Sequence, residues 1–386
     1  MAETKRIALL LGQDVGYCRG VLRGVHSYAV QKKTWVFHDA ASDIRVLGPL
    51  REWRPHGIIA HLFDPEFARE ILALRKPLVN TTNTLEDLDV PVVEVDHRRV
   101  GRLAAEHFIE RGFKHFGYFG SAWTGFSKSR ECSFREALAE AGFELSSCHA
   151  EYLPRPPVDS SWKKGDRQVH DWLLAMPKPA AVLASNDVPA RALAEMCRQL
   201  GICVPHDVAL LGVDNDELEC LLSYPPLSSV VNPAEQIGYR AAKLLDRLMS
   251  GRRPPSKAIL VPPTHVVARQ STDIIAVADP DVSAAVAFIR DHAVENIGVP
   301  DIIKNLAISR RGLERRFCQM LGRSMLQEIQ RVRVERAKHL LLETNLLMPA
   351  IARCSGFSTP QRLAAVFRSV TGQSPLAYRR GAPSHR

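Results

Sequence analysis

Short apolar runs alternate with helical patterns over the first 270 residues, and this alternation restricts the fold more than any other feature of the chain. Runs such as RIALLL (6–11), GIIAHL (57–62), AAVLAS (180–185) and VALLGVD (208–214) read as strands. Strands this apolar are buried on both faces, which is typical of a parallel sheet covered by helices. The alternation is too long for one small sheet, so the sequence predicts two doubly wound α/β lobes.

Further strands are expected at residues 77–80, 92–96, 115–120, 228–231, 258–261 and 264–268 and near 149–153. Helices are expected at residues 18–31, 64–75, 97–112, 127–142, 162–175, 187–200 and 233–250. The pattern ends in the polar stretch STDIIAVADPDVS, where Asp279 and Pro280 are expected to break any helix. We therefore predict one domain at 1–270, a linker at 271–282 and an all-helical domain at 283–386.

The positive charge of the chain is confined to its last quarter. Residues 281–386 hold 17 Lys and Arg against 8 Asp and Glu, which gives the same net charge of +9 as the whole chain, 51 against 42. Residues 1–280 are therefore balanced at 34 against 34. Fifteen of the 17 cations are arginine, whose planar fork donates two parallel hydrogen bonds to phosphate or guanine. This asymmetry predicts a nucleic-acid reader, and the alternative is a basic domain that is merely soluble.

Two C-terminal segments match one template, PDIIKNLAISRRGLERRFCQMLG (300–322) and MPAIARCSGFSTPQRLAAVFRSVTG (348–372). Each has a short apolar helix, a tight turn and a longer helix, with Ser309 and Ser358 as the expected N-caps. In both longer helices a leucine is followed four residues later by a phenylalanine, which places both side chains on the inner face. The opposite faces carry the residues that we expect to contact DNA: Arg310, Arg311, Glu314 and Arg315 in the first unit, and Thr359, Gln361 and Arg362 in the second. The pattern predicts two helix-turn-helix units that enter major grooves, and the alternative is a plain α-hairpin with a charged outer face.

Residues 283–380 resemble the DNA-binding domain of the AraC/XylS family over essentially its full length. The two units, the connecting RVERAKHLLLETNLLMPAIARCSGF (333–357) and the closing TGQSPLAYRR carry the resemblance. It implies two helix-turn-helix units on one connecting helix that read successive major grooves of double-stranded DNA, with RNA polymerase as an expected partner. Small residues, Gly312 and the pair Ala364 and Ala365, stand where members of the family often have larger contact side chains.

Polar side chains follow the carboxyl ends of two predicted strands, the edge that lines the ligand crevice of open α/β folds. ASNDVPARAL supplies Asn186 and Asp187, and LLGVDNDEL supplies Asp214. SKSRECSFREAL places Arg130 near the start of a helix that faces the same cleft. Asp, Asn and Arg can each bond two adjacent hydroxyls, so these residues point to a polyol ligand. Each of them alone would equally suit a helix cap or a turn.

Residues 5–270 resemble the sensor domain of LacI-type regulators and the periplasmic sugar-binding proteins. The segments GVDND, ASND, RECSF and LSSVVNPAEQIGYRAAKLLDRLMSG carry this resemblance. It implies a two-lobed sensor with a ligand site at Arg130, Asn186, Asp187 and Asp214. LacI-type proteins usually begin with their own helix-turn-helix, whereas here the first strand comes at once and the DNA reader follows the sensor.

The order of a LacI-like sensor and then an AraC-type reader resembles the D-xylose-responsive activators of xylose operons. It implies a sugar effector, with a pentose such as D-xylose expected, and activation of transcription in its presence. Tyr17 and Trp162 are expected to stack on the apolar face of the sugar, with Trp123 and Phe126 as further candidates. For each of these aromatic residues the alternative is a place in the core.

We expect a homodimer on two half-sites, because LacI-like bodies normally pair through their first lobe. The expected contacts come from the helix at 18–31 and the stretch at 64–75. A sugar bound between the lobes would favour their closed state and, through the linkers, reset the spacing of the two DNA readers.

Other features exclude several classes of protein. No apolar run approaches the ~20 residues that span a bilayer, and the N-terminal MAETKRIALLLGQDVGY reads as a strand rather than a signal peptide. The eight cysteines are scattered without a C-x-x-C pair, so we expect a reducing cytoplasm, no metal site and no cofactor. Nucleophile-elbow, phosphate-loop and dinucleotide motifs are missing, so we expect no enzyme. Two alternatives stay open: an enzyme domain fused to an AraC-type DNA reader, and a LacI-like sensor for another small metabolite.

Overall fold

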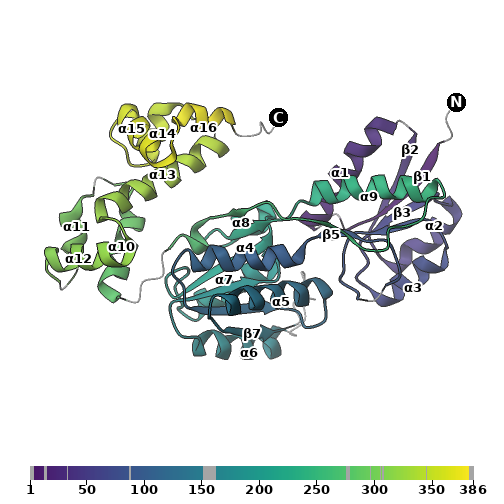
Figure 1. Ribbon diagram of the computed structural model, residues 1–386, viewed down its shortest axis with the longest axis horizontal. Coiled ribbons are helices and arrows are strands. Elements are labelled where there is room, and N and C mark those ends of the chain that lie inside the picture. The colour runs from purple at the N-terminus through teal and green to yellow at the C-terminus, as the bar shows by residue number, and fades with distance from the viewer. Residues whose placement is uncertain are drawn as a thin grey trace. The chain divides into compact units, whose positions relative to one another are not determined.

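The computed structural model describes residues 4–12, 15–32, 34–86, 88–150, 162–274, 279–295, 297–304, 306, 308–344 and 346–381. The chain divides into two compact units, the N-terminal unit Met1–Ile274 and the C-terminal unit Ile275–Arg386 (Figure 1). Among the described residues, no helix is long and apolar enough to cross a membrane.

The first lobe of the N-terminal unit is a parallel sheet between two layers of helices (Figure 1). Its strand order is β2-β1-β3-β4, with β1 at Lys5–Leu10, β2 at Trp35–Ala40, β3 at Gly57–Ala60 and β4 at Leu78–Asn80. A parallel pair, β5 (Val93–Val95) and β11 (Ile259–Val261), continues the sheet through a bridge from Asn80 to Val92. The surrounding helices are α1 (Gly16–Lys32), α2 (Leu47–Trp53), α3 (Pro65–Ala73) and α9 (Ala234–Met249). Helices α2 and α3 pack on Ala8, Leu10, Ile58 and Ala60, so these strands are buried on both faces, as their composition predicts.

The second lobe is a larger sheet with strand order β12-β10-β9-β8-β6-β7, parallel except for β12. The strands are β6 (His115–Gly120), β7 (Leu145–His149), β8 (Ala180–Ala184), β9 (Val208–Asp214), β10 (Ser228–Val231) and β12 (Val266–Val267). The helices are α4 (His97–Ile109), α5 (Gly125–Glu140), α6 (Trp162–Ala175), α7 (Asp187–Gln199) and α8 (Glu217–Leu222). The carboxyl ends of β8 and β9 meet at one edge, which places Asn186 and Asp214 together.

Three crossovers join the lobes within the described residues. The chain passes from β5 to α4 at 95–97, from β10 to α9 at 231–234, and from β11 to β12 at 261–266. Helix α9 belongs with the first lobe because it packs closely on α1, where Gly24 leaves no room for a Cβ beside the Glu235 carbonyl. Side chains on these crossovers therefore lie between the lobes.

The C-terminal unit is all-helical, as the sequence predicts. It contains α10 (Pro280–His292), α11 (Val299–Ile303), α12 (Arg310–Leu321), α13 (Met325–Glu343), α14 (Met348–Cys354), α15 (Pro360–Thr371) and α16 (Pro375–Gly381). One core contains Leu313 and Phe317 of α12, and a second contains Leu363 and Phe367 of α15. The long helix α13 contributes to both cores, so two similar helix-turn-helix units share one helix.

Two differences from the predicted elements occur at sheet edges. The predicted strand near 149–153 lies earlier, at β7, and residues 151–153 lie outside the described part of the chain. Strand β2 was not predicted, and both β2 and β7 are edge strands with partly exposed residues: the apolar run of β2 covers only residues 35–37, and β7 has none. Helix α8 was also not predicted, because its leucines 218, 221 and 222 are exposed and give no inner face.

Two predicted boundaries in the C-terminal half also differ. Asp279 and Pro280 do not break a helix but begin α10: the Asp279 carboxylate caps it, and proline occupies the first turn, where no amide donor is needed. Helix α10 therefore starts inside the predicted linker at 271–282, of which residues 275–278 lie outside the described part. The expected N-cap Ser309 is confirmed, whereas the expected N-cap Ser358 is wrong, because the hydroxyl of Thr359 accepts from the Arg362 amide at 3.2 Å.

Candidate ligand cleft and nucleic-acid interface

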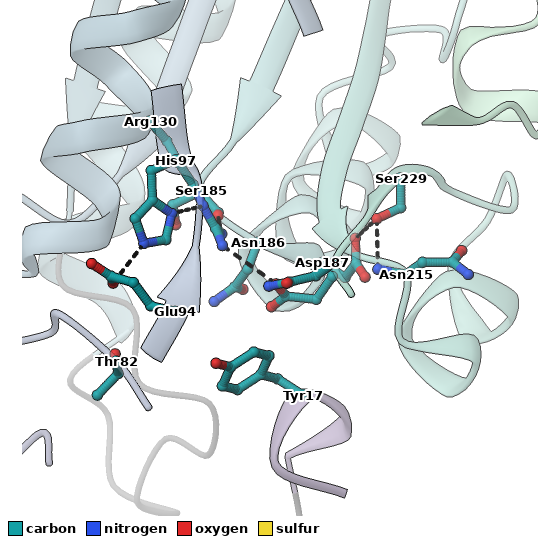
Figure 2. A network of polar contacts seen from close by, with 12 residues as sticks. Tyr17, Thr82, Glu94, His97, Arg130, Ser185, Asn186, Asp187, Asn215 and Ser229 are labelled. Atoms are coloured by element: carbon teal, nitrogen blue, oxygen red, sulfur yellow. Dashed lines mark hydrogen bonds and ion pairs between the residues drawn. The ribbon is translucent and has the colours of Figure 1, made fainter. Parts of the chain in front are cut away.

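Arg130 is the centre of a polar network between the lobes (Figure 2). It projects from α5, its side chain is only 4% exposed, and it donates to the Ser185 carbonyl and, at 3.4 Å, to the Asp214 carboxylate. Its Nε donates to His97 Nδ1 at 3.3 Å, and the ring of Phe126 lies 5.1 Å below the guanidinium. A buried guanidinium with this many partners is held in one orientation, as a binding residue requires.

Asp214 ends β9 in a left-handed conformation, with φ at 107°. Asparagine and aspartate tolerate this region better than most residues, and Asn215 follows with φ at 53°. One Asp214 oxygen accepts from Arg130 and from Asn232 Nδ2, the latter at 3.0 Å. Burial raises the pKa of this carboxyl, and the Arg130 guanidinium opposes that shift. The sequence placed Arg130 and Asp214 in one site, and the structure brings them together.

Asp187 supports the site instead of lining it. Its carboxylate accepts from the Ser229 hydroxyl at 2.6 Å and from the Asp216 amide at 2.7 Å, and the residue is 1% exposed (Figure 2). A Cβ at Gly212 would overlap this carboxylate, so the strand before the loop accommodates it. Burial, and then the charge of Asp214, raise the pKa of Asp187 well above its usual value. Asp187 therefore braces the loop that carries Asp214.

Asn186 caps α7, and its side-chain oxygen accepts from the Val188 amide at 3.1 Å. This is the alternative role that its position allowed. The cap uses only the oxygen, and Figure 2 shows the amide group between Arg130 and Tyr17. The residue can therefore cap the helix and still present its amide donors to the cleft.

Tyr17 faces this network from the first lobe, at the start of α1 (Figure 2). Its hydroxyl donates to the Thr81 carbonyl at 2.6 Å, and its ring meets His61 edge-on with centroids 5.8 Å apart. Burial raises the pKa of Tyr17 well above its usual value, and the charges of Asp214 and Glu94 add to the shift. The Tyr17 ring thus lies near the carboxylates of Asp214 in the second lobe and of Glu94 in β5.

The other aromatic candidates differ in position. Trp123 is 72% exposed and Phe126 packs under Arg130. The side chain of Trp162, the first residue of α6, lies outside the described part of the structure.

Several polar residues of this site were not selected from the sequence, and the crossovers and the first lobe bring them here. Glu94 lies within β5, and its carboxylate accepts from His97 Nε2 at 3.1 Å, because His97 Nδ1 already accepts from Arg130; both side chains are about 90% buried. Burial lowers the pKa of His97 in spite of its carboxylate partner, and burial lowers the pKa of His61 to about 4. Among the described residues, Asn232 Oδ1, His61 Nδ1 and Asn83 Oδ1 are buried atoms without a hydrogen-bond partner. Such atoms suit a hydroxyl-rich ligand.

Contacts outside the network also join the lobes. Arg19 of α1 approaches Asp216 at 3.4 Å, and Lys128 of α5 pairs with Glu86 at 2.6 Å. A Cβ at Gly125 would overlap the Asn83 carbonyl, so α5 begins against the first lobe. The two lobes are therefore in direct contact on both sides of the polar network in this structure.

In the C-terminal unit, the predicted DNA-contacting side chains lie on exposed surfaces of α12 and α15. All seven predicted contact residues are exposed: Arg310, Arg311, Glu314, Arg315, Thr359, Gln361 and Arg362. Arg310 pairs with Glu314 at 2.9 Å along α12, and Thr359 is already the N-cap of α15. Arg316 turns inward and pairs with Asp279 and Asp281, each at 3.1 Å. The surface thus presents guanidinium and amide groups near the start of both longer helices, where a major groove would meet them.

Two family models match the chain: residues 105–272 match a periplasmic binding protein-like domain, and residues 302–381 match a helix-turn-helix domain. The chain is 31% identical over 383 residues to the xylose operon regulatory protein of Escherichia coli strain K12, covering 97% of this chain and 96% of that protein. The Haemophilus influenzae protein of the same name is 28% identical over 387 residues, covering 97% and 98%. The solved structure of the xylose-binding transcription activator xylR matches with a TM-score of 0.78 at 29% identity and covers 98% of each chain.

Proposed function

This chain belongs to the family of xylose operon regulatory proteins, and from that premise we propose that it regulates transcription in response to D-xylose. The single observation that carries the proposal is similarity over almost the whole of both chains, which includes the sensor and the DNA reader in the same order. The polar network around Arg130 supports it, because its donors and acceptors suit the hydroxyls of a neutral sugar.

We propose that Arg130, Asn186 and Asp214 bind the sugar directly, with Tyr17 closing the site from the first lobe. Asp187 was expected in the same set, and its two protein partners favour a supporting role. His61, Glu94, His97 and Asn232 are added as further ligand-facing groups: His61 and Asn232 have buried atoms without partners, and Glu94 and His97 extend the Arg130 network. Trp162 stays a prediction from sequence.

We propose the domain order that the sequence predicts, a sensor at 1–270, a linker at 271–282 and a DNA reader at 283–386, with the connection itself narrowed to the residues between Ile274 and the start of α10 at Pro280. In the reader, the exposed residues of α12 and α15 enter adjacent major grooves of operator DNA. We propose that the protein acts as a homodimer on two half-sites and contacts RNA polymerase to activate transcription. It leaves its sugar unchanged, since its relatives are regulators.

We propose that sugar binding favours the closed state of the two lobes, because the sugar contacts side chains of both. Such a ligand shifts the equilibrium only by its difference in affinity for the two states, and a change from 1:99 to 99:1 needs ~5.5 kcal/mol. The exposed pair Lys128–Glu86 contributes about 0–1 kcal/mol to this, and the partly buried pair Arg19–Asp216 is long at 3.4 Å. The bonds of the buried network must supply most of the difference.

Calorimetry and thermal shift of the full chain with D-xylose, other pentoses and hexoses test this function. At a sugar concentration 100 times the Kd, binding to the folded state alone should add ~2.7 kcal/mol to the free energy of unfolding. The sugar should be recovered unchanged, and its addition should alter binding to operator DNA. If none of these sugars shifts the unfolding temperature, the assignment of the cleft is wrong.

A further inference from the structure

The two helix-turn-helix units have separate hydrophobic cores, and α13 is the element common to both. Met325 and Ile329 of α13 pack in the first core, whereas Val334, Ala337 and Leu341 pack in the second. The change from one core to the other occurs over about one turn of the helix. A single shared helix would let the units bend and twist relative to one another, because no common core holds them.

Arg333 lies on α13 at this change and reaches back to the first unit. Its Nε donates to the Ala293 carbonyl at 2.6 Å, and its Nη2 donates to the Glu295 carbonyl at 2.9 Å. Ala293 is the C-cap of α10, where carbonyl groups have no partner within the helix and where the helix dipole favours a cation. The guanidinium therefore fastens the end of α10 to the part of α13 that begins the second core.

The turn of the second unit, at Gly356, packs against the Ala293 carbonyl and the Arg333 side chain. Gly356, between α14 and α15, has φ at 83°, and a Cβ there would lie 2.5 Å from the Ala293 carbonyl and 3.0 Å from Arg333 Nε. The backbone of the second unit thus touches the backbone that follows α10. Burial lowers the pKa of Arg333, and the nearby charge of Arg362, a predicted DNA-contacting residue of α15, adds to the effect.

We infer that Arg333 is a positioning residue that locks the two helix-turn-helix units together, through the Ala293 and Glu295 carbonyls and against Gly356, so that α12 and α15 present their side chains at one fixed separation. The inference rests on the proposed DNA-reading function. It concerns the separation between α12 and α15, not the charge that binds DNA, because the Arg333 guanidinium is occupied by carbonyl groups and does not neutralise a phosphate.

The test uses the full chain and a duplex selected by that chain from a random-sequence library. Arg333→Gln should weaken binding to this duplex by about tenfold or more, and the slope of log K against log salt should stay at the parent value. A residue that neutralises a phosphate would lower that slope by ~0.9 when removed. Inserting one base pair between the two groove contacts should weaken the parent strongly and the variant much less, because its units are no longer locked.

Arg333→Lys is the second variant, and it keeps the charge. An ammonium group lacks the planar fork that bridges two carbonyls, so this variant should also tolerate the insertion. For a phosphate contact, Arg333→Lys would instead behave like the parent. Lys338→Gln is the matched control, because the substitution removes one positive charge from the same helix. Among the described contacts, Lys338 pairs only with Glu335. The control should keep the parent's dependence on spacing.

A distance measurement separates this inference from the DNA-binding function. Cys318 in α12 and Cys354 at the end of α14 are exposed, one in each unit, and take spin labels after the exposed Cys132 and Cys203 are changed to serine. The parent should give a narrow distribution of label distances and Arg333→Gln a broad one, with or without DNA. A parent that binds no duplex would refute the proposed function alone. Equal distributions in parent and variant, or a slope lowered by ~0.9 with the spacing effect intact, would refute the positioning role.

Discussion

Asp214→Asn tests the ligand cleft most directly, since the substitution keeps the size of the side chain and removes its charge. In the structure, one Asp214 oxygen accepts from Arg130 and from Asn232, and the side chain is 18% exposed. A hydrogen bond to a charged group contributes about 1.5–3 kcal/mol. Loss of one such bond to a sugar hydroxyl should therefore raise the Kd for D-xylose about 10- to 150-fold.

Asparagine is the better replacement than alanine at this position. Asp214→Ala would leave the buried Arg130 without its carboxylate, and breaking a buried pair costs about 3–5 kcal/mol of stability. Asp214→Asn keeps an oxygen that can accept from Arg130, which also retains the Ser185 carbonyl and His97. A fall in sugar affinity can then be measured on a folded protein.

Titration calorimetry of the full chain with D-xylose is the assay, with circular dichroism to show that the variant is folded. Glu195→Gln is the control, because Glu195 is a half-exposed carboxylate that pairs with Arg198 on α7. It should bind sugar like the parent, and all three proteins should bind operator DNA equally in the absence of sugar. Parent-like affinity for D-xylose in Asp214→Asn would refute a role for this carboxylate in the cleft.

The pH dependence of binding gives the same test a second readout. Burial raises the pKa of Asp214, so its ionised, accepting form is lost at a higher pH than that of an ordinary aspartate. The parent's affinity for D-xylose should fall as the pH is lowered towards this raised pKa. The fall should be smaller in Asp214→Asn, and an equal fall in both proteins would assign the titration to another group.

Three further predictions concern the brace, the reader and the assembly. Asp187→Asn should keep both contacts of Asp187, because its carbonyl oxygen can accept from the Asp216 amide and its amide can donate to Ser229. The pKa of Asp187 is raised in the folded state, so the parent loses free energy of unfolding as the pH rises above the pKa of an unfolded aspartate. In thermal melts the variant should therefore lose less stability than the parent between acid and neutral pH. Arg311→Ala should weaken binding to the selected duplex by ~1–3 kcal/mol if the side chain pairs with a guanine, and the loss should disappear on duplexes altered at that one base pair. Sedimentation at micromolar concentration should give a dimer, and a monomer both with and without sugar and DNA would contradict the proposed assembly.

The sequence predicted the strands at the centre of each sheet and the residues at their carboxyl ends. Buried central strands have continuous apolar runs, and the topology of parallel sheets brings their ends to one edge, so Arg130, Asn186 and Asp214 could be selected together. Edge strands β2 and β7 lack that signal because solvent covers part of their surface. The part of the site that was missed also lacks a local signal in the sequence.

The missed residues lie on crossovers or on the first lobe, and their meeting depends on how the lobes close. His97 and Asn232 come from two crossovers far apart in sequence, so no single stretch of the sequence shows them together. The one available signal was VVEVDH, in which the charged residues Glu94 and Asp96 and then His97 occur at the end of a short strand. Asp187 shows the opposite limit, since a carboxylate at a strand end can as well support a loop as bind a ligand.

The arginines of the C-terminal unit show how far a charge count can be used. The excess of arginine indicated the DNA-reading unit, yet many of these arginines make contacts within the unit. Arg316 pairs with Asp279 and Asp281, and Arg323 and Arg331 pair with the buried Glu328. Arg333, Arg336 and Arg379 donate to carbonyls near helix ends. A domain made of short helices has many such ends, and each attracts a cation. The same residue type therefore serves both the fold and the surface. Position on the helix separates the two uses, because Arg311 and Arg315 lie on the face of α12 opposite Leu313 and Phe317, whereas Arg316 lies beside that core.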